Sequence, residues 1–235
     1  TPVQPEKPKV QLPEDMIKVM DTHGTLDKWN EMHFMSYEIV RADGNEKQQI
    51  DLKTRNERIE GSNFKTGYDG TQYWVEADDS FKRDPVFYKN LMFYFYAMPF
   101  VLADEGIQYT PAEPLTFEDK SYPGFQISYA KGIGESPEDE YFIHYNPSTY
   151  QMEWLGYTVT YFSGKKSKEV KWIRYDDWKK FDGLVLPNSM TWYTVEEGQI
   201  KEPKGEATQF VNVTLSKEAP APTIFEKTPN ATTSQ

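Results

Sequence analysis

The sequence predicts a mainly β protein with a few helices, either an incomplete antiparallel β-barrel or a strongly curved sheet whose concave face is plugged by helices. Two observations predict this class. Short segments in which apolar and polar residues alternate recur along the 235 residues, and turn-forming Gly, Pro, Asn and Asp separate them at close spacing. Aromatic residues, which favour strands, make up 15% of the chain. We expect about nine or ten strands in a single domain.

The first element is a short helix over residues 13–22. Two acidic residues at its start suit the positive end of a helix dipole. Met16, Val19 and Met20 fall on one face, which we expect to be buried. Gly24 then ends the helix, because glycine accepts the left-handed conformation that closes a last turn.

Strands follow from residue 33, where the apolar period changes from helical spacing to two. Turns are expected at residues 42–45 and at Asp69-Gly70, because an Asp-Gly pair accepts the positive φ angles of a tight hairpin turn. Further strands are expected at 48–60, 125–129, 141–145, 150–160, 170–175, 190–195 and 208–215.

The segment 86–98 (VFYKNLMFYFYAM) breaks the strand pattern. Read as one helix, it is apolar on every side and therefore needs cover on every side. Two interpretations stay open: a core helix between sheet and loops, or a helix with one face lining a cavity for an apolar ligand. The candidate lining residues of that cavity are Phe87, Leu91, Tyr94, Phe95, Met98, Phe100 and Trp74.

Composition excludes several classes of function. The formal net charge of −11 argues against a nucleic-acid partner, since such proteins carry a basic face. The absence of cysteine excludes disulfides, thiolate metal sites and a cysteine nucleophile. The longest uncharged apolar run, residues 91–102, is shorter than the ~20 residues that a membrane-spanning helix needs.

No catalytic residue, metal site or cofactor is predicted. The three histidines show neither HxH nor HExxH spacing, so we expect structural roles for His23, His33 and His144. Adjacent carboxylates on a strand point to opposite faces and make poor acid–base pairs, which leaves a solvated surface or, as an alternative, calcium binding at a turn. These acidic runs are Asp78-Asp79, Glu118-Asp119, Glu138-Asp139-Glu140 and Asp176-Asp177.

Two further motifs are weak. Gly132-Ile133-Gly134 lacks the helix that a nucleotide-binding loop requires. The basic cluster 165–168 is interpreted as a solvated hairpin tip, with contact to anionic lipid headgroups as the alternative.

Three regions are expected along the chain. Residues 1–12, rich in proline, form a flexible N-terminal tether, residues 13–216 form one domain, and residues 217–235 form an extended tail.

Several short motifs, mostly turns and strand starts, support a family resemblance over roughly residues 14–215. They are His23-Gly24 with Trp29, Gly67-Tyr68-Asp69-Gly70 with Trp74, Pro99-Phe100-Val101-Leu102, Asp139-Glu140-Tyr141, Asn146-Pro147 with Thr149, and Gly183-Leu184 with Leu186-Pro187. With these motifs the chain resembles the LolA/LolB-like superfamily. More closely, it resembles an uncharacterised family of secreted or lipid-anchored proteins from Bacteroidetes, a domain of unknown function.

The resemblance implies a periplasmic or outer-membrane protein whose incomplete barrel holds a lipid or acyl chain. It also implies a lipidated cysteine just before Thr1, with the N-terminal segment as membrane tether. We therefore expect a monomeric, non-enzymatic envelope protein that binds an apolar small molecule or lipid between sheet and aromatic helix. The alternatives are an envelope interaction module with a protein or glycan partner and a packed core, and a hydrolase that uses clustered carboxylates.

Overall fold

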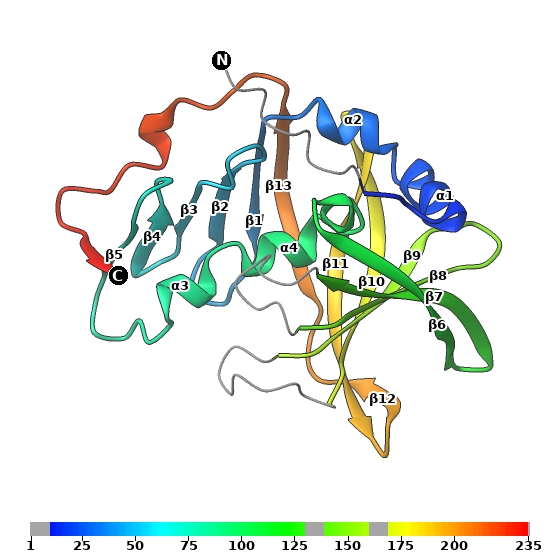
Figure 1. Ribbon diagram of the computed structural model, residues 1–235. Helices are drawn as coiled ribbons and strands as arrows, with labels where there is room; N and C mark the ends of the chain where they lie inside the picture. Colours follow the sequence, from blue (N-terminus) through cyan, green and yellow to red (C-terminus); the bar gives the residue numbers. More distant parts are fainter. Residues whose placement is uncertain (1–9, 130–138, 160–168, 235) are drawn as a thin grey trace. The chain divides into compact units, whose positions relative to one another are not determined.

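The computed structural model describes residues 10–129, 139–159 and 169–234 (Figure 1). The chain divides into two compact units. Unit 1 comprises Thr1–Leu26, Pro99–Asp176 and Met190–Ala207, and unit 2 comprises Asp27–Met98, Asp177–Ser189 and Thr208–Gln235. The single domain predicted over residues 13–216 stays a prediction.

Strands dominate the described part of the chain. They form a 14-stranded sheet in the order β14-β5-β4-β3-β2-β1-β13-β11-β10-β9-β8-β7-β6, with β12 paired to β11. The order runs from one edge strand to another without closing on itself. The predicted class, an unclosed antiparallel sheet with a few helices, is confirmed.

Unit 2 is built on a meander of five antiparallel strands. Its elements are α2 (Leu26–Asn30), β1 (Phe34–Ile39), β2 (Glu46–Asp51), β3 (Glu57–Glu60), β4 (Phe64–Tyr68), β5 (Tyr73–Ala77), α3 (Pro85–Tyr88), α4 (Leu91–Tyr96), β13 (Thr208–Ser216), η2 (Pro222–Ile224) and β14 (Thr232–Ser234). The predicted turns are confirmed: Gly44 lies between β1 and β2 with φ 120°, and Gly70 lies between β4 and β5 with φ 98°. β13 completes the pairing of β1 on its other side.

Unit 1 contains α1 and most of the second half of the chain. Its elements are α1 (Glu14–Thr22), η1 (Phe100–Ala103), β6 (Ile107–Phe117), β7 (Lys120–Tyr129), β8 (Tyr141–Tyr145), β9 (Met152–Tyr157) and β12 (Gln199–Pro203). The long strands β10 (Lys171–Phe181) and β11 (Leu184–Glu196) contribute residues to both units. The predicted first helix is confirmed, with Met16, Val19 and Met20 buried.

Strand β6 was not predicted, because Pro111 and Pro114 interrupt its pattern. The structure explains how they are tolerated. β6 is an edge strand paired only with β7, and its register shifts between Ala112 and Leu115, beside the second proline. Proline lacks the N–H that a central strand must donate, so it is confined to edges and bulges.

The segment predicted as one helix over 86–98 is two short helices, α3 and α4, and this is a correction. Asn90 separates them with a left-handed backbone (φ 58°), and its N–H donates to the buried carboxylate of Glu57 at 2.7 Å. Asparagine tolerates this conformation better than most residues. Asp84 caps α3 by accepting a hydrogen bond from the Val86 N–H at 2.9 Å.

The residues after 217 belong to unit 2 and are hydrogen-bonded to its strands. The indole of Trp74 donates to the carbonyl of Phe225 at 2.9 Å, and Arg58 donates to the carbonyl of Ile224 at 3.2 Å. Phe225 is buried, and β14 pairs with β5. None of the helices in the described ranges is long and apolar enough to cross a membrane.

Candidate functional site

The inner side of the aromatic segment packs directly on the sheet of unit 2. Figure 1 shows α3 and α4 lying across the strands of the meander. The ring of Tyr96 lies 4.4 Å from the rings of both Tyr37 on β1 and Phe210 on β13. Tyr96 and Phe93 are completely buried. On this side, therefore, the aromatic segment meets protein side chains.

Polar side chains lie on the sheet face beneath the helices, where an apolar cavity lining was expected. Glu46 and Gln48 alternate with exposed residues along β2, and Glu57 on β3 lies opposite Ile50 on the same face. All three polar residues are at most 2% exposed. Buried polar groups of this kind are stable only when they are hydrogen-bonded.

Glu46 is the centre of that hydrogen-bonded network. Its Oε1 accepts hydrogen bonds from the Tyr88 hydroxyl at 2.6 Å and from the Gln48 amide at 2.8 Å. Gln48 in turn accepts from the Tyr37 hydroxyl at 2.7 Å. Burial, followed by the nearby charge of Glu57, raises the pKa of Tyr37 well above its usual value. Tyr37 therefore stays a neutral hydrogen-bond donor at physiological pH.

The seven candidate lining residues are not brought together. Phe95 and Met98 are buried, Leu91 packs against the cluster of Ile59, Phe64 and Tyr88, and Phe87 and Tyr94 are half-buried. Trp74 lies on the other sheet face, because its cross-strand neighbours are Gly67, then Arg58, then Gln49. Phe100 is buried in unit 1.

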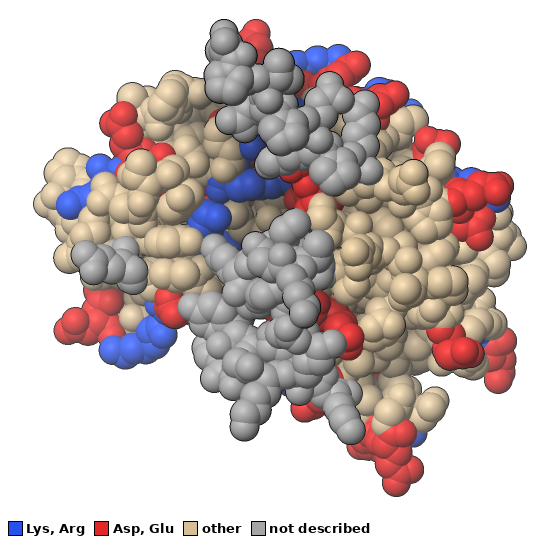
Figure 2. All heavy atoms as spheres, viewed as in Figure 1, with Lys and Arg blue, Asp and Glu red and all other residues tan. Residues whose placement is uncertain are grey.

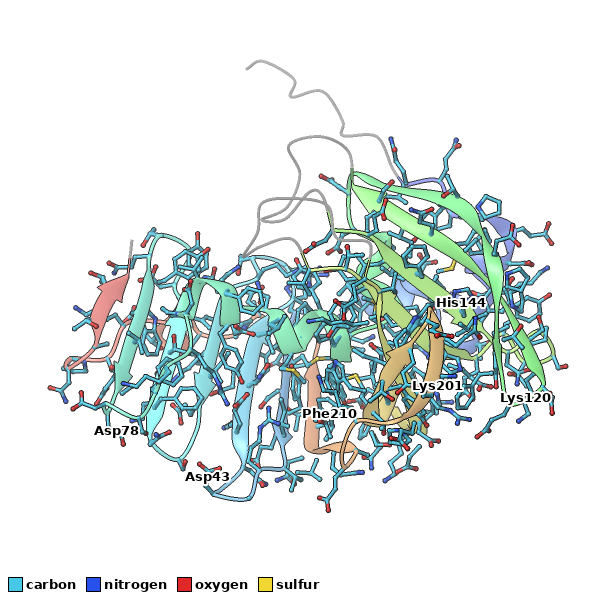
Figure 3. All side chains as sticks on the ribbon, turned by 90° about the horizontal axis from the view of Figure 1, so that it is seen from below. Asp43, Asp78, Lys120, His144, Lys201 and Phe210 are labelled. Carbon is cyan, nitrogen blue, oxygen red and sulfur yellow. The ribbon has the colours of Figure 1, made fainter. Side chains whose placement is uncertain are left out.

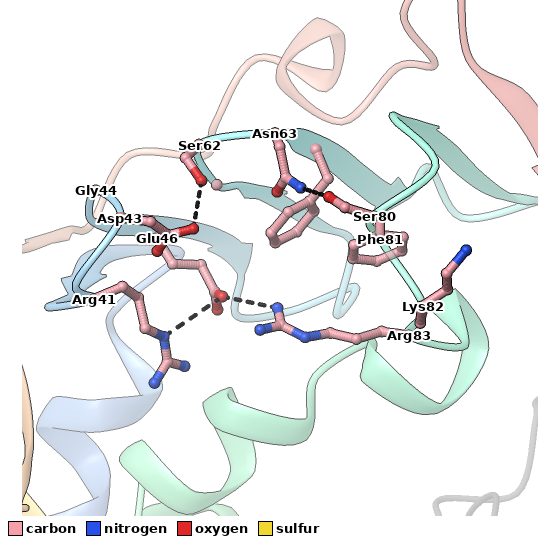
Figure 4. Close-up of a pocket in the computed structure, with 12 residues that line it drawn as sticks. Arg41, Asp43, Gly44, Glu46, Ser62, Asn63, Ser80, Phe81, Lys82 and Arg83 are labelled. Carbon is pink, nitrogen blue, oxygen red and sulfur yellow. Dashed lines mark hydrogen bonds and ion pairs between the residues drawn. The ribbon is translucent and has the colours of Figure 1, made fainter.

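A polar pocket of about 300 Å³ opens at the strand ends of unit 2 (Figure 4). The β1–β2 turn, the β3–β4 turn and the segment before α3 form its walls, and Asp43 and Asp78 lie at this end of the strands (Figure 3). Its polar walls include Arg41, Ser62, Asn63 and Arg83. A second, more open cavity of about 340 Å³ shares the β3–β4 turn.

Two arginines meet the buried Glu46 at the wall of this pocket. Arg83 donates to Oε2 of Glu46 at 3.1 Å, and Nε of Arg41 lies 3.8 Å from the same oxygen. The guanidinium of Arg83 also stacks over the rings of Tyr88 and Phe64, at 4.5 and 5.3 Å from their centroids. Glu46 therefore links the pocket to the network beneath the aromatic segment.

The carboxylates of the pocket are not arranged for acid–base chemistry. Asp43 accepts a hydrogen bond from the Ser62 hydroxyl at 2.8 Å, and this bond above all holds the pKa of Asp43 below its usual value, with a smaller contribution from the arginines. A general acid at neutral pH needs a raised pKa. Asp43 is therefore a hydrogen-bond acceptor here.

The side chains of His23 and His144 are buried and hydrogen-bonded, in agreement with the structural roles predicted for them. His23 accepts a hydrogen bond from the Met152 N–H at 3.1 Å, and His144 donates through Nδ1 to the carbonyl of Tyr122 at 3.0 Å. Burial lowers the pKa of His144. The N–H of His33 donates to the Ser216 carbonyl at 2.8 Å.

Acidic residues are spread over the visible surface instead of gathering at one place (Figure 2). Within residues 10–129, 139–159 and 169–234, no group of three or more histidines and carboxylates is placed to hold a metal ion. The Gly132-Ile133-Gly134 motif, the basic cluster 165–168, Glu138 and the first nine residues lie outside the described residues.

Three residues of this site, Arg41, Glu46 and Arg83, were not predicted. A signal was present for Glu46, because it falls in the same alternating series as Ile50 and so belongs to the buried face of β2. The sequence carried no such signal for the two arginines, because polar residues are ordinary in turns and loops. Residue 83 comes next to residue 46 only in the folded chain.

Comparisons with known proteins bear on family and fold. A family profile described as "Family of unknown function (DUF6503)" matches residues 62–182. No curated protein matches the sequence. Among solved structures, a DUF1329 family protein from Desulfovibrio piger has 13% identity and a TM-score of 0.51 over 88% of this chain and 95% of its own. A LolA superfamily protein from Nitrosomonas europaea has 12% identity and a TM-score of 0.47 over 86% and 96%. The first of these shows a shared fold.

Proposed function

The chain belongs to the DUF6503 family of unknown function, and from that premise we propose that it is a non-enzymatic cell-envelope protein that binds a lipid or acyl chain on its aromatic segment. The ligand lies along the outer side of that segment, where Phe87 and Tyr94 are half-buried. This site replaces the predicted cavity between sheet and helix.

One observation carries the proposal. The residues of 86–98 are apolar on both sides, and the inner side is sealed by direct contact of Tyr96 with Tyr37 and Phe210. The outer row is thus the part of the segment that a ligand can reach. Apolar side chains gathered in this way favour burial against another apolar surface.

An envelope location is supported by the sequence resemblance to the LolA/LolB-like superfamily. That resemblance implies a periplasmic or outer-membrane protein.

Titration of the delipidated chain with a dansyl-labelled fatty acid tests the proposal. We expect saturable binding by the natural chain and binding about five- to thirtyfold weaker in the double variant Phe87→Ser and Tyr94→Ser. At most about a third of each ring is exposed, so covering it contributes roughly 0.5–1 kcal/mol, a third of what full burial contributes.

Ile17→Ser is the matched control, because Ile17 is an apolar side chain on α1 that is 46% exposed. Its binding should equal that of the natural chain. Absence of fatty-acid binding, or equal binding by all the proteins, contradicts the proposal.

A second candidate is an envelope interaction module with a protein partner. The sealed inner side of the segment favours it, because a packed core leaves only an outer surface for recognition. A photo-crosslinking residue at position 87, compared with one at position 17, tests this in cells. A partner cross-linked from position 87 alone supports this function, and identical products from both positions contradict it.

A hydrolase is not proposed. Asp43 and Glu46 line the same pocket, but both carboxylates already accept hydrogen bonds from neighbouring side chains. Because its pKa is lowered, Asp43 is ionised at neutral pH and has no proton to deliver.

A further inference from the structure

The pocket at the strand ends of unit 2 has a charge opposite to that of the whole protein. Its walls carry the cations Arg41, Lys82 and Arg83 against the two carboxylates Asp43 and Glu46. The chain as a whole has a formal charge of −11. A positive recess in an acidic protein concentrates anionic ligands there, because the field of local charges dominates at short range.

The arginines keep hydrogen-bond donors available. Among the described residues Arg41 donates no hydrogen bond although 32% of its side chain is exposed, and Arg83, 44% exposed, donates one, to Glu46. Each guanidinium has five N–H donors in a planar fork that fits a carboxylate or phosphate. The buried carboxylate of Glu46 holds both cations at one wall, which prepares a site for a second anion.

The other walls suit a ligand that also has hydroxyl groups. Asp43 is an ionised acceptor, and Asn63 keeps its side-chain oxygen as an acceptor while its amide donates to Ser80 and Asp78. The partly exposed ring of Phe81, stacked at 4.5 Å on Phe64, offers a flat apolar surface. A volume of about 300 Å³ lies at the lower end of the range for small-molecule pockets.

We propose that this pocket binds an acidic monosaccharide group, that is, a sugar carrying a carboxylate or a phosphate. The anionic group lies on the guanidinium groups of Arg41 and Arg83, the hydroxyls donate to Asp43 and Asn63, and the sugar ring covers Phe81. The inference goes beyond fatty-acid binding and does not depend on it, since it uses other residues and another ligand.

Isothermal titration calorimetry of the full chain at low salt tests the proposal. The probes are glucuronate and glucose 6-phosphate, which separate the carboxylate from the phosphate source, with glucose and inorganic phosphate for comparison. We expect at least one of the two acidic sugars to bind, at least tenfold more tightly than glucose and than inorganic phosphate. A charge-assisted hydrogen bond to arginine accounts for the difference from glucose, and the contacts of the sugar with Asp43, Asn63 and Phe81 account for the difference from inorganic phosphate.

The variant Arg41→Gln should weaken binding of the acidic sugar at least tenfold, because it removes a guanidinium that donates no hydrogen bond within the described protein. Arg41 is also an ion-pair partner of the buried Glu46, at 3.8 Å, so the Tm of the variant is measured together with its affinity to show that it is folded. Lys47→Gln is the matched control: it removes the same charge from an exposed position on β2, next to Glu46, and should leave affinity within twofold. Arg41→Lys keeps the positive charge beside Glu46 but lacks the planar fork of N–H donors. Its affinity for the acidic sugar should therefore be several-fold lower than that of the natural chain, and it tests the proposal even if Arg41→Gln does not fold.

Three results would overturn the proposal. They are no binding of either acidic sugar, equal affinity for glucose, and affinity in Arg41→Lys equal to that of the natural chain. Inorganic phosphate binding as tightly as glucose 6-phosphate would overturn the sugar part. Each of these results leaves the fatty-acid titration unaffected, so the two proposals fail separately.

Discussion

Replacing Glu46 with glutamine tests whether the buried carboxylate organises unit 2. The side chain is 2% exposed and receives hydrogen bonds from Tyr88, Gln48 and Arg83. Glutamine keeps the shape and can still accept from Tyr88 and Gln48 through its oxygen. Its amide, however, faces Arg83 with a donor against a donor, so that hydrogen bond is lost.

The loss can be estimated bond by bond. A hydrogen bond to a charged group contributes about 1.5–3 kcal/mol, and the Tyr88 bond weakens by roughly half when its acceptor becomes neutral. Because Arg83 is 44% exposed, water compensates part of its loss. We expect Glu46→Gln to lower the free energy of unfolding by about 2–4 kcal/mol. For a chain of this size, that corresponds to a Tm lower by roughly 4–16 °C.

Glu60→Gln on the neighbouring strand β3 is the matched control. Glu60 pairs with Arg58 at 2.6 Å, but its side chain is 34% exposed. Surface ion pairs contribute about 0–1 kcal/mol, so this variant should melt close to the natural chain. Urea unfolding followed by tryptophan fluorescence measures both. Equal losses in the two variants, or a loss below about 0.5 kcal/mol for Glu46→Gln, would refute the reasoning.

Three further predictions follow from single positions. Asn90→Ala should lower the free energy of unfolding by about 1 kcal/mol, because alanine is strained at φ 58°, whereas Asn90→Gly should leave it nearly unchanged. Equal effects of the two variants in urea unfolding would contradict this. Gly67→Ala should lower the free energy of unfolding by more than about 2 kcal/mol, because the added Cβ would lie 2.5 Å from the carbonyl oxygen of Glu57 and 2.6 Å from the ring of Trp74. A Tm within 2 °C of that of the natural chain would contradict this prediction. Burial makes the pKa of His144 lower in the folded chain than in the unfolded chain, where it is about 6.5. The neutral side chain therefore contributes fully to the free energy of unfolding above pH 6.5, and this contribution is lost as the pH falls below that value. His144→Gln should therefore lose less Tm than the natural chain between pH 7.5 and pH 5.5, and parallel curves would contradict the reasoning.

Local rules predicted the elements that depend on near neighbours. The helix at 14–22 and the turns at Gly44 and Gly70 follow from residue type and spacing, and the structure has them. Strand β6 was missed because Pro111 and Pro114 are forbidden in a central strand, and only the sheet order reveals that β6 is an edge.

The site depends on contacts that no local rule contains. Asn90 breaks the aromatic helix because its N–H reaches Glu57, 33 positions earlier in the sequence. Arg83 meets Glu46 across 37 positions, and the two residues come from a loop and from a strand. Periodicity predicted that residues 86–98 are buried. It could not predict that the sheet face beneath them carries the buried polar residues Glu46, Gln48 and Glu57.

The place of β13 in the sheet has a consequence for the order of folding. β1 pairs on one side with β2, which follows it after a few residues. Its other edge is paired, and the rings of Tyr37 and Tyr96 are covered, only when β13 with Phe210 has been synthesised. The indole of Trp74 likewise has its hydrogen-bond partner 151 positions away, at Phe225. Contacts between such distant positions slow folding, because a long loop must close before they form. During synthesis, unit 2 therefore keeps an open strand edge and uncovered aromatic rings until the segment after residue 208 has left the ribosome, and such surfaces are prone to aggregate.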